Sequence, residues 1–346
     1  MVWSFIAWQD AQLLLQGHPN TSIMKVSALI PTYNRRSHVT RAIDSVLAQT
    51  HSVDEIIVVD DGSTDGTAQM IGARYGNRVR VVQQENAGVS SARRRAVLEA
   101  QSEWIAFLDS DDEWVPDRIR QLWGASVEVS REVAWVFGDV SIVRDGTNPV
   151  GLFSRHGLTV AGQCQVFDDT WSIHHPFQFG LLPASIIRRA ALLEVNGFSE
   201  GLKHSEDYLV GVQVASRYKF AAIPSKVTNV YRTSELSNSS ADLAGRNSPD
   251  YFRARVLAYD LIARSDQRSQ WRRLHEEAVR GLCKSLSEHG ESVRMLALQQ
   301  FRLGCSVRAA AFVVAALLGQ AGLHAWKVVG SSIHRGRDFE GPRYSL

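Results

Sequence analysis

The chain has 346 residues, of which 45% are hydrophobic and 21% are charged, a balance typical of a folded globular protein. Its formal net charge is only +2, which excludes the strongly basic composition of a nucleic-acid-binding protein. Three widely spaced cysteines form no CxxC pair and no metal-finger pattern, which favours a reducing compartment. The length predicts one main domain and a smaller appendage.

Residues 1–23 are predicted to be an N-terminal extension. They contain an apolar stretch but have no basic start, and they include Asp10, so we do not expect a signal peptide. Met24 stands directly before the first clear strand pattern. The extension is either a loosely attached segment or the product of an upstream start.

From Lys25 to Leu108, short β-rich runs alternate with stretches of helical periodicity, which predicts a parallel sheet with crossover helices. The predicted strands are Val26–Ile30, Glu55–Val59, Val79–Val82 and Trp104–Leu108. In an open sheet of this kind, ligands bind in the crevice outside the carboxyl ends of the strands. We therefore expect three polar clusters to converge on one site: 31–35, 60–61 and 109–112.

The pattern weakens after Asp139, and four aromatic residues fall in a loop-rich stretch, where they either shape an acceptor pocket or pack in the core: Trp171, His174, His175 and Phe177. A helix over 206–216 and a strand near 227–231 are predicted to close a domain spanning 24–240. A linker rich in Ser and Asn follows, over 234–249. The region 247–346 is predicted to be a helical appendage.

The C-terminal region is basic, with 15 Lys and Arg against 9 Asp and Glu from Asn247 onward, a charge of +6, while the first 246 residues carry −4. This charge fits either a solvated helix face or attraction to an anionic membrane surface. The uncharged run Ala309–Trp326 is long enough to span a bilayer, but Gln320 and His324 lower its hydrophobicity. The alternatives are a helix docked on protein and one lying on the bilayer. We predict a cytoplasmic protein with peripheral contact at the inner face of the cell membrane.

Three aspartates, Asp109, Asp111 and Asp112, directly follow the apolar strand that ends at Leu108. Clustered carboxylates repel one another, and a divalent cation relieves that repulsion. Hard oxygen ligands suit Mg²⁺ or Mn²⁺, and Mg²⁺ is commonly held by one or two carboxylates together with substrate phosphates. We predict metal and nucleotide binding for Asp109 and Asp111, and a helix-capping role for Asp112.

Four sequence blocks, in this order and spacing, resemble those of family 2 glycosyltransferases: Val26–Arg35, Glu55–Thr67, Asn86–Ser90 and Phe107–Asp112. The resemblance extends over about residues 24–235, and the combination of blocks is highly specific. It implies a GT-A fold, which is the α/β fold of nucleotide-diphospho-sugar transferases, with a mostly parallel sheet flanked by helices. It also implies an inverting mechanism, a nucleotide-sugar donor and a glycan or lipid-linked acceptor.

The same resemblance assigns donor binding to a set of residues after the first two strands: Pro31, Tyr33, Asn34, Arg35 and Asp61. Asp109 and Asp111 would form the family's DxD motif, with Asp111 touching the metal. From their chemistry, Tyr33 can stack on a base, and Asp61 can accept hydrogen bonds from a pyrimidine or ribose. Asp60 is interpreted as a turn residue, and Asp65 with Thr67 as caps of the next helix.

Glycosyl transfer also needs a base, because a sugar hydroxyl is a poor nucleophile until its proton is withdrawn. Glu206-Asp207 resembles the family's ED motif, and Asp207 is the predicted base; the alternative is a carboxylate that interacts with the helix macrodipole. Arg232 either meets the diphosphate or forms a surface salt bridge. Arg93 and Arg94 either approach phosphate or lie on a solvated helix face.

The Gln-x-x-Arg-Trp signature of processive polymer synthases is absent from the sequence, which favours a single-transfer enzyme. No G-x-G-x-x-G turn follows the first strand, which argues against a dehydrogenase. The alternative function is a nucleotide-sugar-binding scaffold without activity. That alternative predicts a damaged DxD motif or a missing base, and the sequence shows neither.

Overall fold

The computed structural model describes residues 25–128, 132–177, 182–198, 202, 205–232, 249–265 and 269–288. The predicted extension 1–23, nearly all of the predicted linker and the run Ala309–Trp326 lie outside these residues. Within the described part of the chain, no helix is both long enough and apolar enough to cross a membrane.

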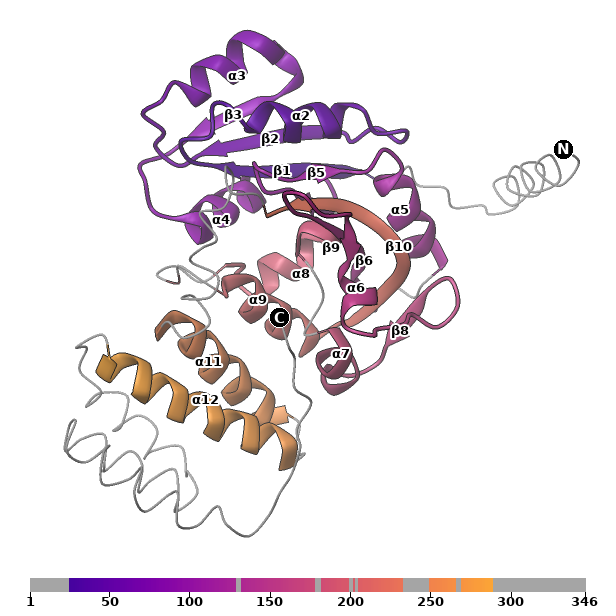
Figure 1. Ribbon diagram of the computed structural model, residues 1–346, viewed down its shortest axis with the longest axis vertical. Coiled ribbons are helices and arrows are strands. Elements are labelled where there is room, and N and C mark those ends of the chain that lie inside the picture. The colour runs from indigo at the N-terminus through magenta and orange to yellow at the C-terminus, as the bar shows by residue number, and fades with distance from the viewer. Residues whose placement is uncertain are drawn as a thin grey trace, which may run out of the picture.

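The centre of the molecule is a mixed β-sheet whose main path runs β3-β2-β1-β4-β9-β6-β10-β5, with β7 beside β6 and β8 beside β10 (Figure 1). The strands are β1 Val26–Thr32, β2 Glu55–Asp60, β3 Arg80–Gln83, β4 Trp104–Phe107, β5 Glu113–Trp114, β6 Val133–Val143, β7 Val150–Gly151, β8 Gln165–Phe167, β9 Ser185–Arg188 and β10 Lys219–Tyr231. Strands β1 to β4 are parallel to one another, as predicted.

The second half of the sheet departs from the predicted, mostly parallel arrangement. Strand β9 pairs antiparallel with both β4 and β6, and only the pairing of β6 with β10 is parallel in this half. Strand β6 was not predicted because its first nine residues are all buried, so its sequence has no alternation of apolar and polar residues. Strand β1 also continues past its predicted stop, since Pro31 pairs with Val59 of β2.

Helices cover both faces of the sheet. They are α2 Val39–Leu47, α3 Thr67–Tyr75, α4 Val89–Glu99, α5 Arg118–Glu128, α6 Leu152–Arg155, α7 Thr170–Phe177, α8 Arg189–Glu194, α9 Glu206–Ala215, α11 Pro249–Ser265 and α12 Ser269–Glu288, with 3-10 turns at Gly76–Arg78 and Leu182–Ala184. Alternate residues of β1 point to opposite faces: Leu29 joins the core under α4 and α9, whereas Ala28 and Ile30 join the core under α2 and α5. Helix α7 lies in the stretch that was predicted to be loop-rich.

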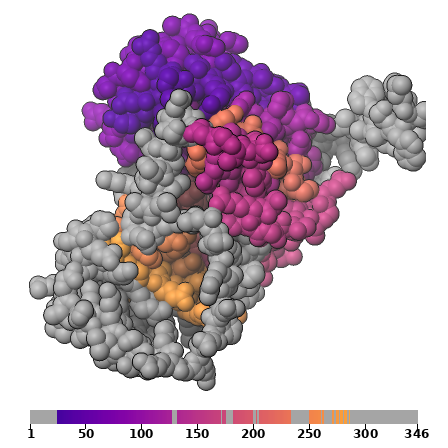
Figure 2. All heavy atoms as spheres, in the orientation of Figure 1, coloured from indigo at the N-terminus to yellow at the C-terminus, as the bar shows by residue number. Residues whose placement is uncertain are grey.

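Helix α11 packs against α9, and α12 packs against α11, on the side of the molecule away from β3 (Figure 1). Ala258, Ile262 and Trp271 are fully buried and belong to the same hydrophobic cluster as Leu29 of β1 and Leu209 of α9. In Figure 2, the indigo and purple atoms of the N-terminal half and the magenta atoms that follow form one continuous surface. Because their buried residues belong to the same cluster as those of β1 and α9, α11 and α12 share a core with the α/β fold.

Candidate active site

The loops that follow β1 and β2 are joined by hydrogen bonds at the carboxyl edge of the sheet, the edge at which β1 to β4 end. The backbone N–H of Asn34 donates to Ser63 Oγ at 2.8 Å, and Asn34 Oδ1 accepts from the backbone N–H of Thr64 at 2.8 Å. Asn34 is exposed and has φ 50°, a conformation that asparagine tolerates better than most residues. Tyr33, 48% exposed, precedes it, whereas Pro31 is buried within β1.

Asp61 is buried, and its carboxylate holds the loop that leads into α4. Its Oδ1 accepts from Gln84 Nε2 at 2.7 Å and from the backbone N–H of Ala87 at 2.9 Å, and its Oδ2 accepts from the N–H of Gly88 at 2.8 Å. Gly88 has φ 89°, a backbone conformation that residues other than glycine rarely adopt. Asp61 thus links the end of β2 to the start of α4, and any contact with a donor would be made from this held position.

Asp60 and Asp65 have the local roles that their positions predict. Asp60 Oδ1 accepts from the backbone N–H of Ser63 at 3.2 Å, which closes the turn after β2. Asp65 Oδ1 accepts from the N–H of Thr67, the first residue of α3, at 3.0 Å. Both carboxylates therefore shape the loop at the carboxyl edge.

The aspartates of the predicted DxD motif follow β4 and are surrounded by arginines. Arg35 Nη2 lies 3.4 Å from Asp111 Oδ2, and Arg41 of α2 donates to the backbone carbonyl of Asp111. Burial and the neighbouring charge of Asp109 raise the pKa of Asp111, although Arg35 and Arg232 oppose the shift. The Arg232 guanidinium donates to the backbone carbonyl of the preceding residue, Tyr231, at 3.2 Å. Arg232 is also close enough to Asp111 to lower the pKa of that carboxyl.

The capping role predicted for Asp112 is wrong. Its Oδ1 accepts from the backbone N–H of Tyr231, at the end of β10, at 3.0 Å, and α5 begins only at Arg118. Asp112 is 1% exposed, and burial together with the charges of Asp109 and Asp111 raises its pKa well above the usual value. It fastens the DxD loop to β10, which the spacing along the chain does not reveal.

Arg93 of α4 is the residue that brings the two acidic motifs together. Its Nη2 lies 2.7 Å from Asp109 Oδ1, and its Nη1 pairs with Glu206 Oε1 at the start of α9. Only 8% of the Arg93 side chain is exposed, so the solvated helix face is wrong for it, and the phosphate contact stays a prediction. Burial disfavours the charged form, but Asp109 and Glu206 outweigh it and raise the pKa of Arg93.

Glu206 and Asp207 occupy contrasting environments in the first turn of α9. Burial raises the pKa of Glu206 to about 7, and Asp207 and Asp109 add to the shift while Arg93 opposes it. Asp207 is exposed, and its Oδ1 accepts from the N–H of Tyr208 at 2.7 Å. The carboxylate predicted to act as the base is therefore the accessible one of the pair.

Asp109 and Asp111 offer a donor set that fits a divalent cation. The described residues contain no cluster of three or more His, Cys, Asp or Glu side chains that could hold a metal ion. Mg²⁺, however, is commonly held by one or two carboxylates and by substrate phosphates. Burial, and after it the charge of Asp109, raises the pKa of Asp111, and a cation bound between the two carboxylates would favour their charged forms. The two aspartates would be the protein's share of the ligands.

Two arginines of the site make contacts that the sequence did not predict; Arg93 was named there without its acidic partners, and Arg41 was not named. Arg93 stands at the head of a helical stripe that continues through Ala96, Val97 and Ala100, so the i, i+3, i+4, i+7 spacing does indicate its burial. Arg41 had no such signal: its guanidinium carbon lies 3.8 Å from the ring centroid of Tyr231, a partner 190 positions away along the chain. That contact depends on where β10 ends.

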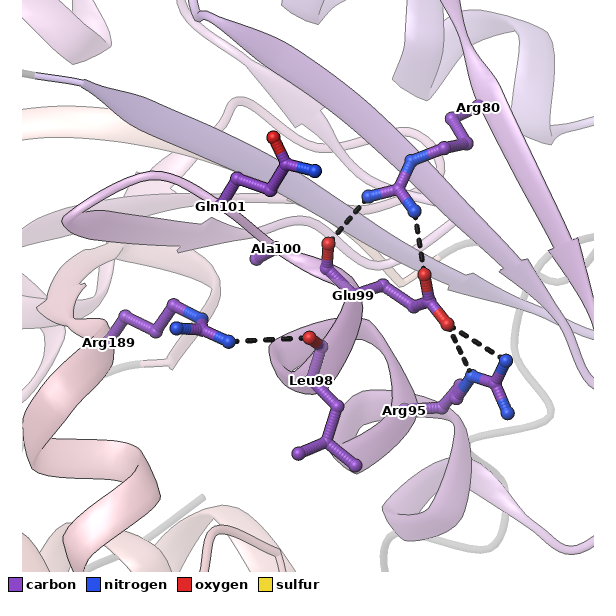
Figure 3. Close-up of a pocket in the computed structure, with 7 residues that line it drawn as sticks. All are labelled: Arg80, Arg95, Leu98, Glu99, Ala100, Gln101 and Arg189. Atoms are coloured by element: carbon purple, nitrogen blue, oxygen red, sulfur yellow. Dashed lines mark hydrogen bonds and ion pairs between the residues drawn. The ribbon is translucent and has the colours of Figure 1, made fainter.

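A separate cavity of about 610 Å³ lies at the amino edge of the sheet, where β3 and β4 begin (Figure 3). Figure 3 shows Arg80 and Arg95 both reaching Glu99, and Arg189 reaching the carbonyl of Leu98. Arg80 also donates to the Glu99 carbonyl at 2.6 Å. These arginines complete the C-terminal end of α4 and are far along the strands from the acidic motifs.

Residues 27–181 match the sequence profile of the family described as "Glycosyl transferase family 2". An uncharacterized glycosyltransferase of Rickettsia felis is 30% identical over 221 residues, which are 63% of this chain and 34% of that protein. The putative teichuronic acid biosynthesis glycosyltransferase TuaG of Bacillus subtilis is 37% identical over 131 residues, 37% of this chain and 51% of TuaG. The chain thus spans a third to a half of the length of these relatives.

The fold is also similar to solved structures. The crystal structure of S. aureus TarS 1–349 in complex with UDP-GlcNAc matches with a TM-score of 0.61 and 20% identity, and the match covers 92% of this chain and 93% of that one. At this level of identity the likeness supports the fold alone, and the GT-A prediction is confirmed.

Proposed function

We propose that this chain is an inverting glycosyltransferase, on the basis of the match of residues 27–181 to the profile of family 2 glycosyltransferases. It moves a sugar from a nucleotide-diphosphate-sugar to a hydroxyl of a glycan or lipid-linked acceptor. The observation that carries this proposal is the position of Arg93, which contacts Asp109 of the DxD motif and Glu206 beside Asp207. A single guanidinium thereby contacts both the motif that is proposed to face the diphosphate and the neighbour of the proposed base.

In the proposed reaction, Asp207 accepts the proton of the acceptor hydroxyl as that oxygen bonds to the anomeric carbon. The bond from the anomeric carbon to the diphosphate breaks in the same displacement, so the configuration inverts. Arg35 and Arg232 are proposed to meet negative charge of the diphosphate, and their interactions with Asp111 support this role. Mg²⁺ or Mn²⁺ held by Asp109 and Asp111 would neutralise charge on the leaving group.

The donor pocket is proposed to use the residues assigned from the sequence: Pro31, Tyr33, Asn34, Arg35, Asp61 and Arg232. Support comes from the exposed ring of Tyr33 and from the hydrogen bonds of Asn34, which join the loops after β1 and β2 into one wall. The similarity to TuaG supports a role in cell-surface polysaccharide or glycan biosynthesis. The acceptor would meet the enzyme at the inner face of the cell membrane.

A panel of UDP-, GDP- and dTDP-sugars, assayed for released nucleotide with and without Mn²⁺, tests the activity. We expect one nucleotide class to be turned over, and only with the divalent cation. NMR of the product's anomeric configuration tests inversion. Tight nucleotide binding without turnover of any donor would instead favour the inactive scaffold.

Release of the full-length protein into the soluble fraction without detergent would contradict the membrane contact.

A further inference from the structure

The first turn of α9 makes a second set of contacts, in addition to the ionic contact of Glu206 with Arg93. Tyr208 directly follows Asp207, and its hydroxyl lies 3.0 Å from the hydroxyl of Tyr259 on α11. Both side chains are nearly buried, with 8% and 5% exposure. Burial raises the pKa of each, so both phenols stay protonated at neutral pH. The contact is therefore a hydrogen bond between neutral groups in the core.

Further rings and a cation fix Tyr208 in this position. The guanidinium carbon of Arg255, also on α11, lies 4.4 Å from the Tyr208 ring centroid, within the range of a cation–π interaction. Arg255 lies over Tyr251 as well, at 3.6 Å. His174 of α7 has its ring centroid 6.2 Å from that of Tyr208, and 5.0 Å from that of Trp271 on α12.

These contacts come from helices that contribute no residue to the DxD motif or to the predicted donor pocket. Trp271 is fully buried, and Tyr259 packs beside it with ring centroids 5.9 Å apart. The contacts of Tyr208 therefore cannot be rearranged without disturbing the packing of α11 on α12. The first turn of α9 is therefore contacted both by Arg93, through Glu206, and by this aromatic cluster, through Tyr208.

We propose that α11 and α12 are a positioning element for the proposed base, in which Tyr259 and Arg255 set the orientation of Asp207 through Tyr208. The inference rests on the proposed function, since it takes Asp207 to be the base. It makes residues 249–288 necessary for turnover even though they do not touch the donor. It also predicts that their influence is exerted on the chemical step and not on donor binding.

The test is Tyr259→Phe, which removes one hydroxyl and keeps the ring. We expect kcat for hydrolysis of the active donor to fall roughly 10-fold, short of the 10²-fold that a 1 Å displacement can cost, with the donor KM unchanged. Arg255→Met should act in the same direction. The matched control is Tyr75→Phe: Tyr75 is 4% exposed, and its hydroxyl donates to Asp44 Oδ1 at 2.8 Å on α2, away from α9.

Hydrogen exchange at the backbone amides of α9 gives a readout that needs no activity. Exchange should be faster in Tyr259→Phe than in wild type, and unchanged in Tyr75→Phe. The proposal is overturned by wild-type kcat in Tyr259→Phe, by an equal loss in Tyr75→Phe, or by unchanged exchange in α9. If the wild-type chain turns over no donor while α9 exchange still rises in Tyr259→Phe, the proposed function fails and the positioning by α11 and α12 remains.

Discussion

The two edges of the sheet differ in how deeply their paired charged side chains are buried. At the carboxyl edge, Arg93 and Glu206 are nearly buried and come from helices 113 positions apart in the chain. At the amino edge, the side chains of Arg80 and Arg95 are 40% and 50% exposed, and Arg95 pairs with Glu99 one helical turn away. Burying charge is costly, so proteins concentrate it at functional sites. The acidic, buried edge is therefore the better candidate for chemistry, although the described cavity with three arginines lies at the other edge.

The largest expected effect that separates the edges is on turnover. Asp207→Asn should lower kcat for donor turnover by about 10² to 10⁴, the range that general-base catalysis contributes. Because Asp207 is exposed and accepts a local backbone hydrogen bond that asparagine can also accept, donor binding should persist. Released nucleotide and isothermal titration with the nucleotide measure the two quantities.

Glu99→Gln is the matched control for Asp207→Asn, since it removes one carboxylate charge at the amino edge and leaves the carboxyl edge intact. We expect wild-type kcat in Glu99→Gln. Equal losses in the two variants would show that the edges do not differ in function.

The next largest expected effect is on the free energy of unfolding, when the buried guanidinium of Arg93 is removed. Arg93→Met leaves Asp109 and Glu206 without their shared partner, and breaking a buried ion pair from one side typically costs about 3–5 kcal/mol of unfolding free energy. Urea unfolding measures this loss. Adding Glu206→Gln should recover part of it, because one unpaired charge is then removed. A double variant less stable than Arg93→Met alone would contradict the assignment.

The sequence predicted the carboxyl edge through local patterns and missed what depends on packing between distant elements. Asp61, Asp109 and Asp111 directly follow apolar strands, so the parallel topology alone brings them to one edge. The helical spacing of Arg93 with Ala96 shows that it faces the core, but not that it meets Glu206. That pairing depends on how α9 crosses α4.

Elements were missed for equally physical reasons. Strand β6 is buried on both faces and so shows no alternation, and the sequence pattern does not indicate α7 because this helix is short and contains Pro176. Of the four aromatic residues noted in that stretch, His174 packs against Tyr208 and Trp271, while the other three side chains lie outside the described part of the chain.

A smaller effect is expected at the carboxyl edge, where the free energy of unfolding should depend on pH through Glu206. Burial raises the pKa of Glu206 to about 7 from an ordinary value of 4.5, so between these pH values the folded state binds more protons than the unfolded state. The unfolding free energy should therefore fall as pH rises from 4.5 through 7, by on the order of 1 kcal/mol for each unit. Urea unfolding across this range should show a shallower slope in Glu206→Gln. An unchanged slope would mean that Glu206 is not the group that titrates.

The smallest expected effect belongs to the amino edge. Arg80→Ala removes ion pairs to Glu99 and Glu55 and one hydrogen bond to the Glu99 carbonyl. Exposed pairs of this kind typically contribute about 0–1 kcal/mol, because water screens them and ordering long side chains costs entropy. We expect a urea midpoint close to that of wild type and unchanged donor turnover. A stability loss as large as that of Arg93→Met would mean that exposure does not separate the two edges, and the cavity beside Arg80 would then need to be considered as a site in its own right.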